Sequence, residues 1–474
     1  MNQISLDTNF KLSGEWWLPN NFNKRIHGNL TYSPPGISML ELNGSLFGES
    51  FNSFNTSNVA KFYGTTSLGE KCSLFDVFES FHQFGGTGKS VSKVIFNTLV
   101  KGNEFIDIKT DKFESASFQL FGFKAWYGDA PLRMQIYKNS PSKILSAHLL
   151  KPKVIKHRIK SINTTFEFII TPNNFTTADQ MKMDYAINII VRPSVKKHFT
   201  WYLTTIYRFR QLISLLIARP TQLTMMKISK KKKRIYGVSK KYNYSSNFLD
   251  VIYTQSDYVA LKDSKINRHE IPYPLAAIKK DFATILNNWY KKSSYFGTIY
   301  DLHFSTYSKS SYPIDVNFLF LTQAIEGFHR KKGGGRGLRA YLTEHSYTHI
   351  KDALINAIPT TINKDHRAAL KNKIKYGYEY SLRKRFTLLL KNVPHSIKAL
   401  ITKNDKNFVM KIINTRNYLT HRDKSLEKVA LDMMGKYEAC NSMHLMLTYL
   451  LLSECGIPSK LRNKIFTTHR KYNT

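Results

Sequence analysis

Phe408-Val-Met-Lys-Ile-Ile413 and the nearby stretch Arg416-Asn-Tyr-Leu-Thr-His421 join a run of apolar residues at helical spacing to a cluster of polar side chains. The periodicity predicts one helix through both stretches. At about 100° per residue, Asn417 and His421 would share a face one turn apart. Arg416 would lie about 140° from His421 around the helix axis. A long arginine side chain can span that offset, especially across a pocket between two helices.

The surrounding sequence is predicted to be helical from about residue 312 to its end. Residues 316–329 have the periodicity of a buried helix, which should end at the flexible, basic, glycine-rich stretch 331–337. Further helices are expected at about 338–357, 365–391, 394–402, 405–422 and 435–455. Short connections between amphipathic helices indicate a bundle.

The N-terminal part has the opposite pattern, because short runs alternate apolar and polar residues between Gly, Pro and Asn clusters. Strands are expected at 28–32, 39–43, 94–100, 105–108, 116–121 and 165–170. Their close spacing indicates a sandwich or a barrel. Helical periodicity then appears at 199–218 and 275–289.

We therefore predict an α+β chain of three parts. Residues 1–190 should form a β-rich, sandwich-like domain, and residues 191–305 a mixed, mainly helical middle region. Residues 306–474 should form an all-α bundle. A chain of 474 residues is long enough for two or three domains.

Charge is the strongest global signal, with a formal net charge of +38 and a pI near 9.9. Repulsion among so many positive groups destabilises the folded state unless a polyanion offsets it. Nucleic acid fits that requirement, because phosphates neutralised by Lys and Arg release their condensed counterions. A lysine-rich genome bias would raise the charge without any such purpose.

Several other features narrow the class of protein. No apolar run reaches the roughly 18–20 residues of a membrane span, since Arg208, Arg210 and Gln211 interrupt the best candidate at 199–218. The N-terminus does not resemble a signal peptide. Three cysteines without a CxxC pair argue against a disulfide framework or a zinc site. We expect a cytoplasmic protein that needs neither membrane, metal nor cofactor.

Two motifs invite a functional interpretation that their context does not support. Gly85-Gly-Thr-Gly-Lys-Ser90 has Gln83 where a phosphate-binding loop needs glycine, and a strand rather than a helix should follow, so we predict an ordinary turn. His345 and His349 lie one helical turn apart, but no third metal ligand accompanies them. They are expected to be surface or core histidines.

Two basic runs are candidate contacts for RNA phosphates, although each is first of all a solvated loop. The first run is Lys230, Lys231, Lys232, Lys233 and Arg234. The second is Lys331, Lys332 and Arg336.

Arg416, Asn417 and His421 have residue types suited to RNA cleavage without a metal ion. The RNA 2′-hydroxyl must lose a proton to attack the phosphate, and the departing 5′-oxygen must gain one, which suits histidine. Arginine can stabilise charge that develops on the phosphate oxygens. Asn417 can hold the phosphate or the imidazole by hydrogen bonds. The structural alternative is an arginine that caps neighbouring helices and a histidine on a packed face.

The C-terminal part resembles the HEPN superfamily, whose signature is Arg, usually a polar residue, then His at this spacing. Residues 318–328 look like its first helix, and Tyr380-Ser-Leu-Arg-Lys-Arg-Phe386 looks like the segment before the motif helix in ApeA-type members. The N-terminal part resembles the ApeA N-terminal domain at Gly14-Glu-Trp-Trp-Leu-Pro19, at 26–30 and at 40–44.

The resemblance implies a metal-independent ribonuclease of abortive infection in a bacterium. It implies that two HEPN domains pair as a dimer with a composite cleft, while the N-terminal domain senses a phage-derived trigger. Glu326 would match a polar residue that HEPN proteins often carry near the cleft. A non-catalytic module that binds nucleic acid or protein through its basic surface remains the alternative. A nucleotidyl- or AMP-transferase system is a third interpretation, but it has no partner sequence here.

Overall fold

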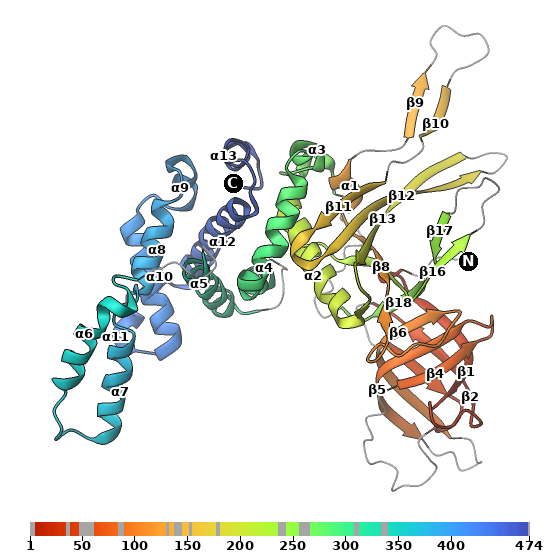
Figure 1. Ribbon diagram of the computed structural model, residues 1–474, viewed down its shortest axis with the longest axis horizontal. Coiled ribbons are helices and arrows are strands. Elements are labelled where there is room, and N and C mark those ends of the chain that lie inside the picture. Colours follow the sequence, from red (N-terminus) through yellow and green to blue (C-terminus); the bar gives the residue numbers. More distant parts are fainter. Residues whose placement is uncertain are drawn as a thin grey trace. The chain divides into compact units, whose positions relative to one another are not determined.

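Two compact units make up the chain, a β unit over Met1–Ala283 and a helical unit over Thr284–Thr474. They are seen in a computed structural model (Figure 1). The structure describes residues 5–34, 38–46, 61–83, 90–128, 132–136, 145–150, 154–176, 181–235, 243–255, 266–307, 312–332 and 340–472.

A closed antiparallel barrel forms the first part of the β unit (Figure 1). Its strands are β1 (Phe10–Trp17), β2 (Ile26–Tyr32), β3 (Met39–Leu42), β4 (Lys61–Thr66), β5 (Lys71–Gln83) and β6 (Val91–Gly102). The barrel closes because β6 pairs with β3 on one edge and with β5 on the other. Trp16 is fully buried inside, where a Cβ on Gly64 would come within 2.3 Å of its ring. Glycine is therefore required at position 64.

The same sheet continues beyond the barrel, because residues 98–101 of β6 pair with β18. The order onward is β18, β15, β8, β13, β12, β11. Their bounds are β8 (Ser115–Leu120), β11 (Ile155–Ile159), β12 (Thr164–Thr176), β13 (Met181–Pro193), β15 (Leu223–Ser229) and β18 (Leu249–Tyr253). Helix α2 (Phe199–Ile217) packs on this part of the sheet, where Phe209 contacts the rings of Phe118 and Phe166.

Smaller elements complete the β unit. Three two-stranded pairs are β7 (Lys112–Phe113) with β14 (Lys197–His198), β9 (Leu132–Ile136) with β10 (Leu145–Leu149), and β16 (Lys232–Ile235) with β17 (Asn243–Ser246). The short helices are α1 (Phe123–Tyr127) and α3 (Leu275–Ile278), with 3-10 turns at Lys160–Ile162 and Arg268–Glu270.

The α+β class is confirmed, and the β part is a barrel with a continuing sheet. The strand expected at 105–108 is wrong. The Ile106 N–H bonds to the Ser73 hydroxyl at 3.1 Å, and Asp107 pairs with Lys61 at 2.6 Å, so these residues form a loop held by side chains. The expected turn at 85–89 lies outside the described residues, and the strand predicted after it is β6.

The expected middle region contributes strands to the β unit, since β15 and β18 lie inside its large sheet. A helix was expected over 275–289, whereas the structure has α3 and then a longer helix from Phe282. The borders predicted at 190/191 and 305/306 remain predictions.

Ten helices form the described part of the helical unit. They are α4 (Phe282–Ser305), α5 (Ile314–Lys331), α6 (Glu344–Asn356), α7 (Lys364–Lys375), α8 (Leu382–Lys391), α9 (His395–Ile401), α10 (Asp405–His421), α11 (Lys424–Glu427), α12 (Met433–Cys455) and α13 (Ser459–Thr468). Helix α5 packs along α12 (Figure 1). Phe296 of α4 stacks on Phe328 of α5, with the ring centroids 5.1 Å apart. Within the described residues, no helix is both long and apolar enough to cross a membrane.

The helix expected at 365–391 is in fact two helices, α7 and α8. A Cβ on Gly377 would meet the Tyr347 hydroxyl at 2.3 Å, and Glu379 forms a β-bridge with Ala340. Ser381 then caps the first turn of α8 through its side chain. Tertiary contacts therefore override helical periodicity at 376–381. The helix expected from 338 begins only at Glu344.

Two histidines stack in the helical unit, where the His303 side chain is buried and that of His444 is half-buried. The rings of His303 (α4) and His444 (α12) lie 4.5 Å apart at an interplanar angle of 17°, beside Tyr307. Burial holds the pKa of His303 well below its ordinary value, and His444 lowers it further. Burial also lowers the pKa of His444 to about 4.

We expect this pair to make the helical unit less stable in acid. Both histidines are neutral in the folded protein, but in the unfolded chain each takes a proton below about pH 6.5. Above pH 6.5 neither histidine lowers the free energy of unfolding. As the pH falls from 6.5 toward 4, each lowers it by about 1.4 kcal/mol per pH unit. His444→Phe, which cannot take a proton, should have a flatter dependence of unfolding free energy on pH. Equal slopes for variant and wild type would contradict this.

Candidate functional site

Helix α10 carries the three residues Arg416, Asn417 and His421 and is fixed at both ends. The Asn404 side chain accepts a hydrogen bond from the Asn407 N–H at the N-terminus, and the helix ends where Arg422 adopts a left-handed φ of 55°.

Thr415 ties α10 to the chain that follows. Its hydroxyl accepts a hydrogen bond from the Leu431 N–H at 2.9 Å. It also donates to the Lys411 carbonyl at 2.8 Å. The position of the motif is therefore set by the helix and by the segment after it.

A pocket of about 500 Å³ lies where α5, α8 and α10 meet. It is lined by Glu326 of α5, by Arg416, Asn417 and Ile413 of α10, and by Ser381, Leu382 and Arg383. The guanidinium of Arg416 donates a hydrogen bond to Asn417 Oδ1 at 3.1 Å. Three of the four residues predicted for this site, Glu326, Arg416 and Asn417, thus share one concave surface.

His421 does not line this pocket. It is the last residue of α10 and is exposed. Hydrogen bonds from the Ser425 hydroxyl and N–H hold the pKa of Asp423 below its ordinary value, and nearby His421 contributes to the same shift. The imidazole therefore lies close to a carboxylate at the surface rather than inside the pocket.

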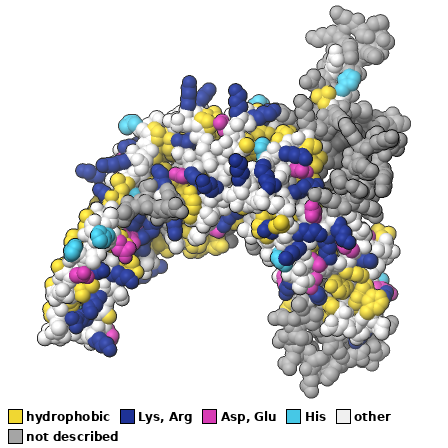
Figure 2. Space-filling model, viewed as in Figure 1, with side chains coloured by type: hydrophobic (Ala, Val, Ile, Leu, Met, Phe, Trp, Pro, Cys, Tyr) yellow, Lys and Arg dark blue, Asp and Glu magenta, His cyan; other side chains and the backbone are white. Residues whose placement is uncertain are grey.

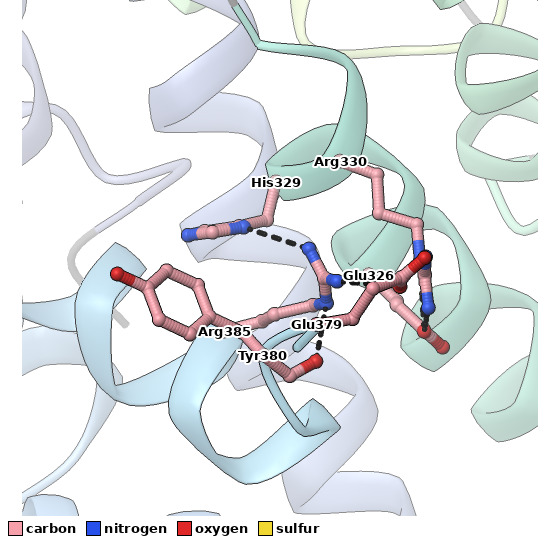
Figure 3. Close-up of polar contacts among 6 residues, drawn as sticks. All are labelled: Glu326, His329, Arg330, Glu379, Tyr380 and Arg385. Atoms are coloured by element: carbon pink, nitrogen blue, oxygen red, sulfur yellow. Dashed lines mark hydrogen bonds and ion pairs between the residues drawn. The ribbon is translucent and has the colours of Figure 1, made fainter. Parts of the chain in front are cut away.

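A network of charged residues lies beside the pocket and links α5 to α8 (Figure 3). The Arg385 side chain, only 2% exposed, donates to Glu379 at 3.1 Å and to the Tyr380 carbonyl at 3.0 Å. Its guanidinium also contacts Nδ1 of His329 at 3.3 Å. Arg330 pairs with both Glu379 and Glu326, the latter at 3.1 Å.

The network is balanced in charge, with two guanidinium groups and two carboxylates. Burial lowers the pKa of Arg385, and the charge of Arg330 lowers it further. Burial also acts to lower the pKa of Arg330, but its contacts with Glu326 and Glu379 raise it overall. The pocket-facing Glu326 is thereby held by an arginine of its own helix.

Of the basic residues proposed as RNA contacts, those whose side chains the structure describes, Lys230, Lys231, Lys331 and Lys332, do not line the pocket. Lys230 pairs with Asp111 at 2.6 Å, and Lys231 is exposed. Lys232, Lys233 and Arg234 form most of strand β16, so the expected loop is in part a hairpin that the sequence pattern did not indicate. Their side chains lie outside the described residues.

The second basic run lies at the end of α5. Lys331 is exposed at its last turn, and the Lys332 N–H bonds to the Phe328 carbonyl. Arg336 lies outside the described residues. Figure 2 shows many Lys and Arg side chains on the visible face of the helical unit, with fewer acidic side chains among them.

His345 and His349 are both exposed on α6, as a surface interpretation expects. In the described part of the chain, no group of three or more His, Cys, Asp or Glu side chains could hold a metal ion.

The sequence interpretation did not identify Ser381, Leu382 and Arg383 as site residues. They occur within Tyr380–Phe386, whose sequence only resembles the segment before the motif helix in related proteins. Nothing in their local pattern shows that the first turn of α8 faces α10, because that proximity depends on how three helices pack.

Two family models match the chain. ApeA N-terminal domain 1 matches residues 11–289, more than half of the chain, and Apea-like HEPN matches residues 319–461. The first spans the barrel, the sheet and α2, and the second spans α5 to the start of α13. Comparisons with curated proteins and with solved structures return no match. The chain belongs to the ApeA-type HEPN proteins, a family of abortive-infection defence.

Proposed function

We propose that this protein is an endoribonuclease of antiphage defence that cuts RNA by attack of the 2′-hydroxyl and needs no metal ion. It would act in the cytoplasm, on RNA of either host or phage. The observation that carries the proposal is the pocket that places Arg416 and Asn417 together in the HEPN-matched part of the chain. A pocket lined by a few polar groups is the usual form of an active site.

Each motif residue has a role in this reaction. His421 transfers the proton of the 2′-hydroxyl or of the leaving 5′-oxygen, since an imidazole exchanges protons near neutral pH. Arg416 donates hydrogen bonds to the phosphate oxygens as negative charge develops on them. Asn417, already bonded to Arg416, holds that guanidinium or the phosphate in place. Glu326 is an accessory residue at the pocket wall.

The placement of His421 supports a site built from two chains. Arg416 lines the pocket, whereas His421 does not line it, is exposed at the end of α10, and lies about 140° from Arg416 around an ideal helix. A second copy that meets the first through its HEPN domain could bring its own exposed histidine to the pocket. We propose such a dimer, with a phage-derived trigger sensed by the N-terminal domain.

The proposal is tested by incubating purified full-length protein with labelled RNA in excess EDTA, with and without an extract of phage-infected cells. His421→Ala protein, run in parallel, accounts for nucleases in the extract. We expect fragments that appear only with the wild-type protein. Salt-sensitive RNA binding with no cleavage in any reaction would favour the non-catalytic binding module instead.

A further inference from the structure

A second arginine of the pocket, Arg383, has no role in the reaction described above. It belongs to the first turn of α8 and lines the same pocket as Arg416. Its side chain is exposed, and among the described residues its guanidinium has no hydrogen-bond or ion-pair partner; only its backbone carbonyl accepts a bond, from Thr387. An unpaired guanidinium in a concave site is available to a ligand.

The charges around the pocket are unevenly compensated. Arg330 and Arg385 are neutralised by Glu326 and Glu379. Arg383 and Arg416 have no carboxylate partner in the described part of the chain.

Among the described residues that line the pocket, Glu326 is the only acid. The pocket-lining carboxylate, Glu326, is already bound by Arg330, and the first turn of α8 contains no acidic residue. The pocket therefore carries two unneutralised positive charges and favours an anion. The positive end of the α8 dipole has the same sign.

The other lining groups point to a nucleotide rather than to a bare inorganic anion. Leu382 and Ile413 provide an apolar wall, while Ser381 and Asn417 provide hydrogen-bonding groups. A volume of about 500 Å³ lies within the range of small-molecule sites. Guanidinium groups bind phosphate oxygens in pairs of hydrogen bonds.

The backbone turn that carries Arg383 is held by neighbouring side chains. Arg385 lies two residues further on, is buried, and donates to the Tyr380 carbonyl just before the helix begins. The Ser381 side chain accepts a hydrogen bond from the Lys384 N–H at 3.3 Å and caps the same turn. The turn that carries Arg383 is thus held in place before a ligand arrives, which reduces the entropy cost of binding.

From these features we infer that Arg383 is a substrate-binding residue that holds the RNA backbone in the pocket together with Arg416. The inference rests on the proposed ribonuclease function and deepens it. Arg416 would contact the phosphate that reacts, and Arg383 would contact an adjacent phosphate of the same strand. The role of Arg383 is to bind and position RNA, and it takes no part in proton transfer.

Binding is measured on full-length His421→Ala protein, so that RNA cannot be consumed during titration. Adding Arg383→Ala should weaken binding of a short labelled RNA about tenfold and reduce the slope of log affinity against log salt by about one. Arg383→Lys should restore the salt slope, because the positive charge returns. It should restore only part of the affinity, because an ammonium group cannot donate the paired hydrogen bonds of a guanidinium. Lys391→Ala, an exposed cation at the other end of α8, is the matched control.

In the chain with intact His421, Arg383→Ala should raise KM about tenfold and change kcat by less than threefold. Affinity equal to that of the Lys391→Ala control would overturn the inference, as would a loss confined to kcat. Failure of the wild-type protein to cut RNA would overturn the proposed function, and it is read from a separate reaction. The two failures are therefore distinguishable.

Discussion

His421→Ala is expected to lower the rate of RNA cleavage by about 10²–10⁴-fold, the usual contribution of a general acid or base. The side chain is exposed at the last position of α10, so its loss leaves no cavity and no unpaired buried group. The variant should fold and bind RNA as the wild type does. Single-turnover cleavage of labelled RNA measures the effect without a contribution from product release.

A histidine elsewhere in the same unit provides the control. His349 is also exposed and also helical, on α6, but it is not part of the motif. His349→Ala should cleave at the wild-type rate. If purified His421→Ala cut RNA as fast as His349→Ala does, His421 would have no part in the reaction.

Arg385→Met is expected to produce the largest loss of stability, about 3 kcal/mol, because it removes the buried partner of an ion pair whose carboxylate, Glu379, is only partly exposed. Methionine approximates the length of the side chain but leaves the Tyr380 carbonyl without its donor and removes one of the two cations on Glu379. Arg330→Ala is the comparison, since Arg330 also binds Glu379 but is 44% exposed. An exposed pair contributes at most about 1 kcal/mol.

Hydrogen–deuterium exchange of the full-length protein measures this effect locally. A loss of about 3 kcal/mol should speed exchange of the α5 and α8 amides by about 100-fold, while the β unit exchanges as before. The Arg330→Ala protein should change exchange by about fivefold or less. Equal effects for the two variants would show that burial of Arg385 contributes nothing beyond a surface pair.

The long-range organisation of this chain was predictable where periodicity is strong. Alternation of apolar residues marked β2, β3 and β6 of the barrel and β8 and β12 of the continuing sheet, but not β1, β4 or β5. Helical spacing marked α2, α5, α10 and α12. The class of fold and the family followed from these patterns and from short motifs at both ends of the chain.

What the sequence did not show depends on contacts between distant residues. The break at 376–381 arises where Gly377 packs against Tyr347 and Glu379 pairs with Ala340, and no local signal marks either contact. The pairing of β6 with β3, β18 and β5 likewise depends on the whole sheet.

The residues of the candidate site likewise include some that the sequence predicted and some that it did not. Arg416, Asn417 and Glu326 could be named from their spacing and their resemblance, and they line one pocket. Arg383 could not be named, because its proximity to α10 follows from helix packing alone. The position of His421 outside the pocket was also unforeseen, since the helix geometry alone placed it on the face of Asn417.

The most direct measurement compares one labelled RNA with its all-deoxy copy, both incubated with the wild-type protein and the extract of phage-infected cells in excess EDTA. We predict that the RNA is cut and that each 5′ fragment ends in a 2′,3′-cyclic phosphate, while the copy without 2′-hydroxyl groups stays intact. Cleavage of the deoxy copy, or loss of all cleavage in EDTA with full activity in Mg²⁺, would contradict 2′-hydroxyl attack at a site of arginine and histidine.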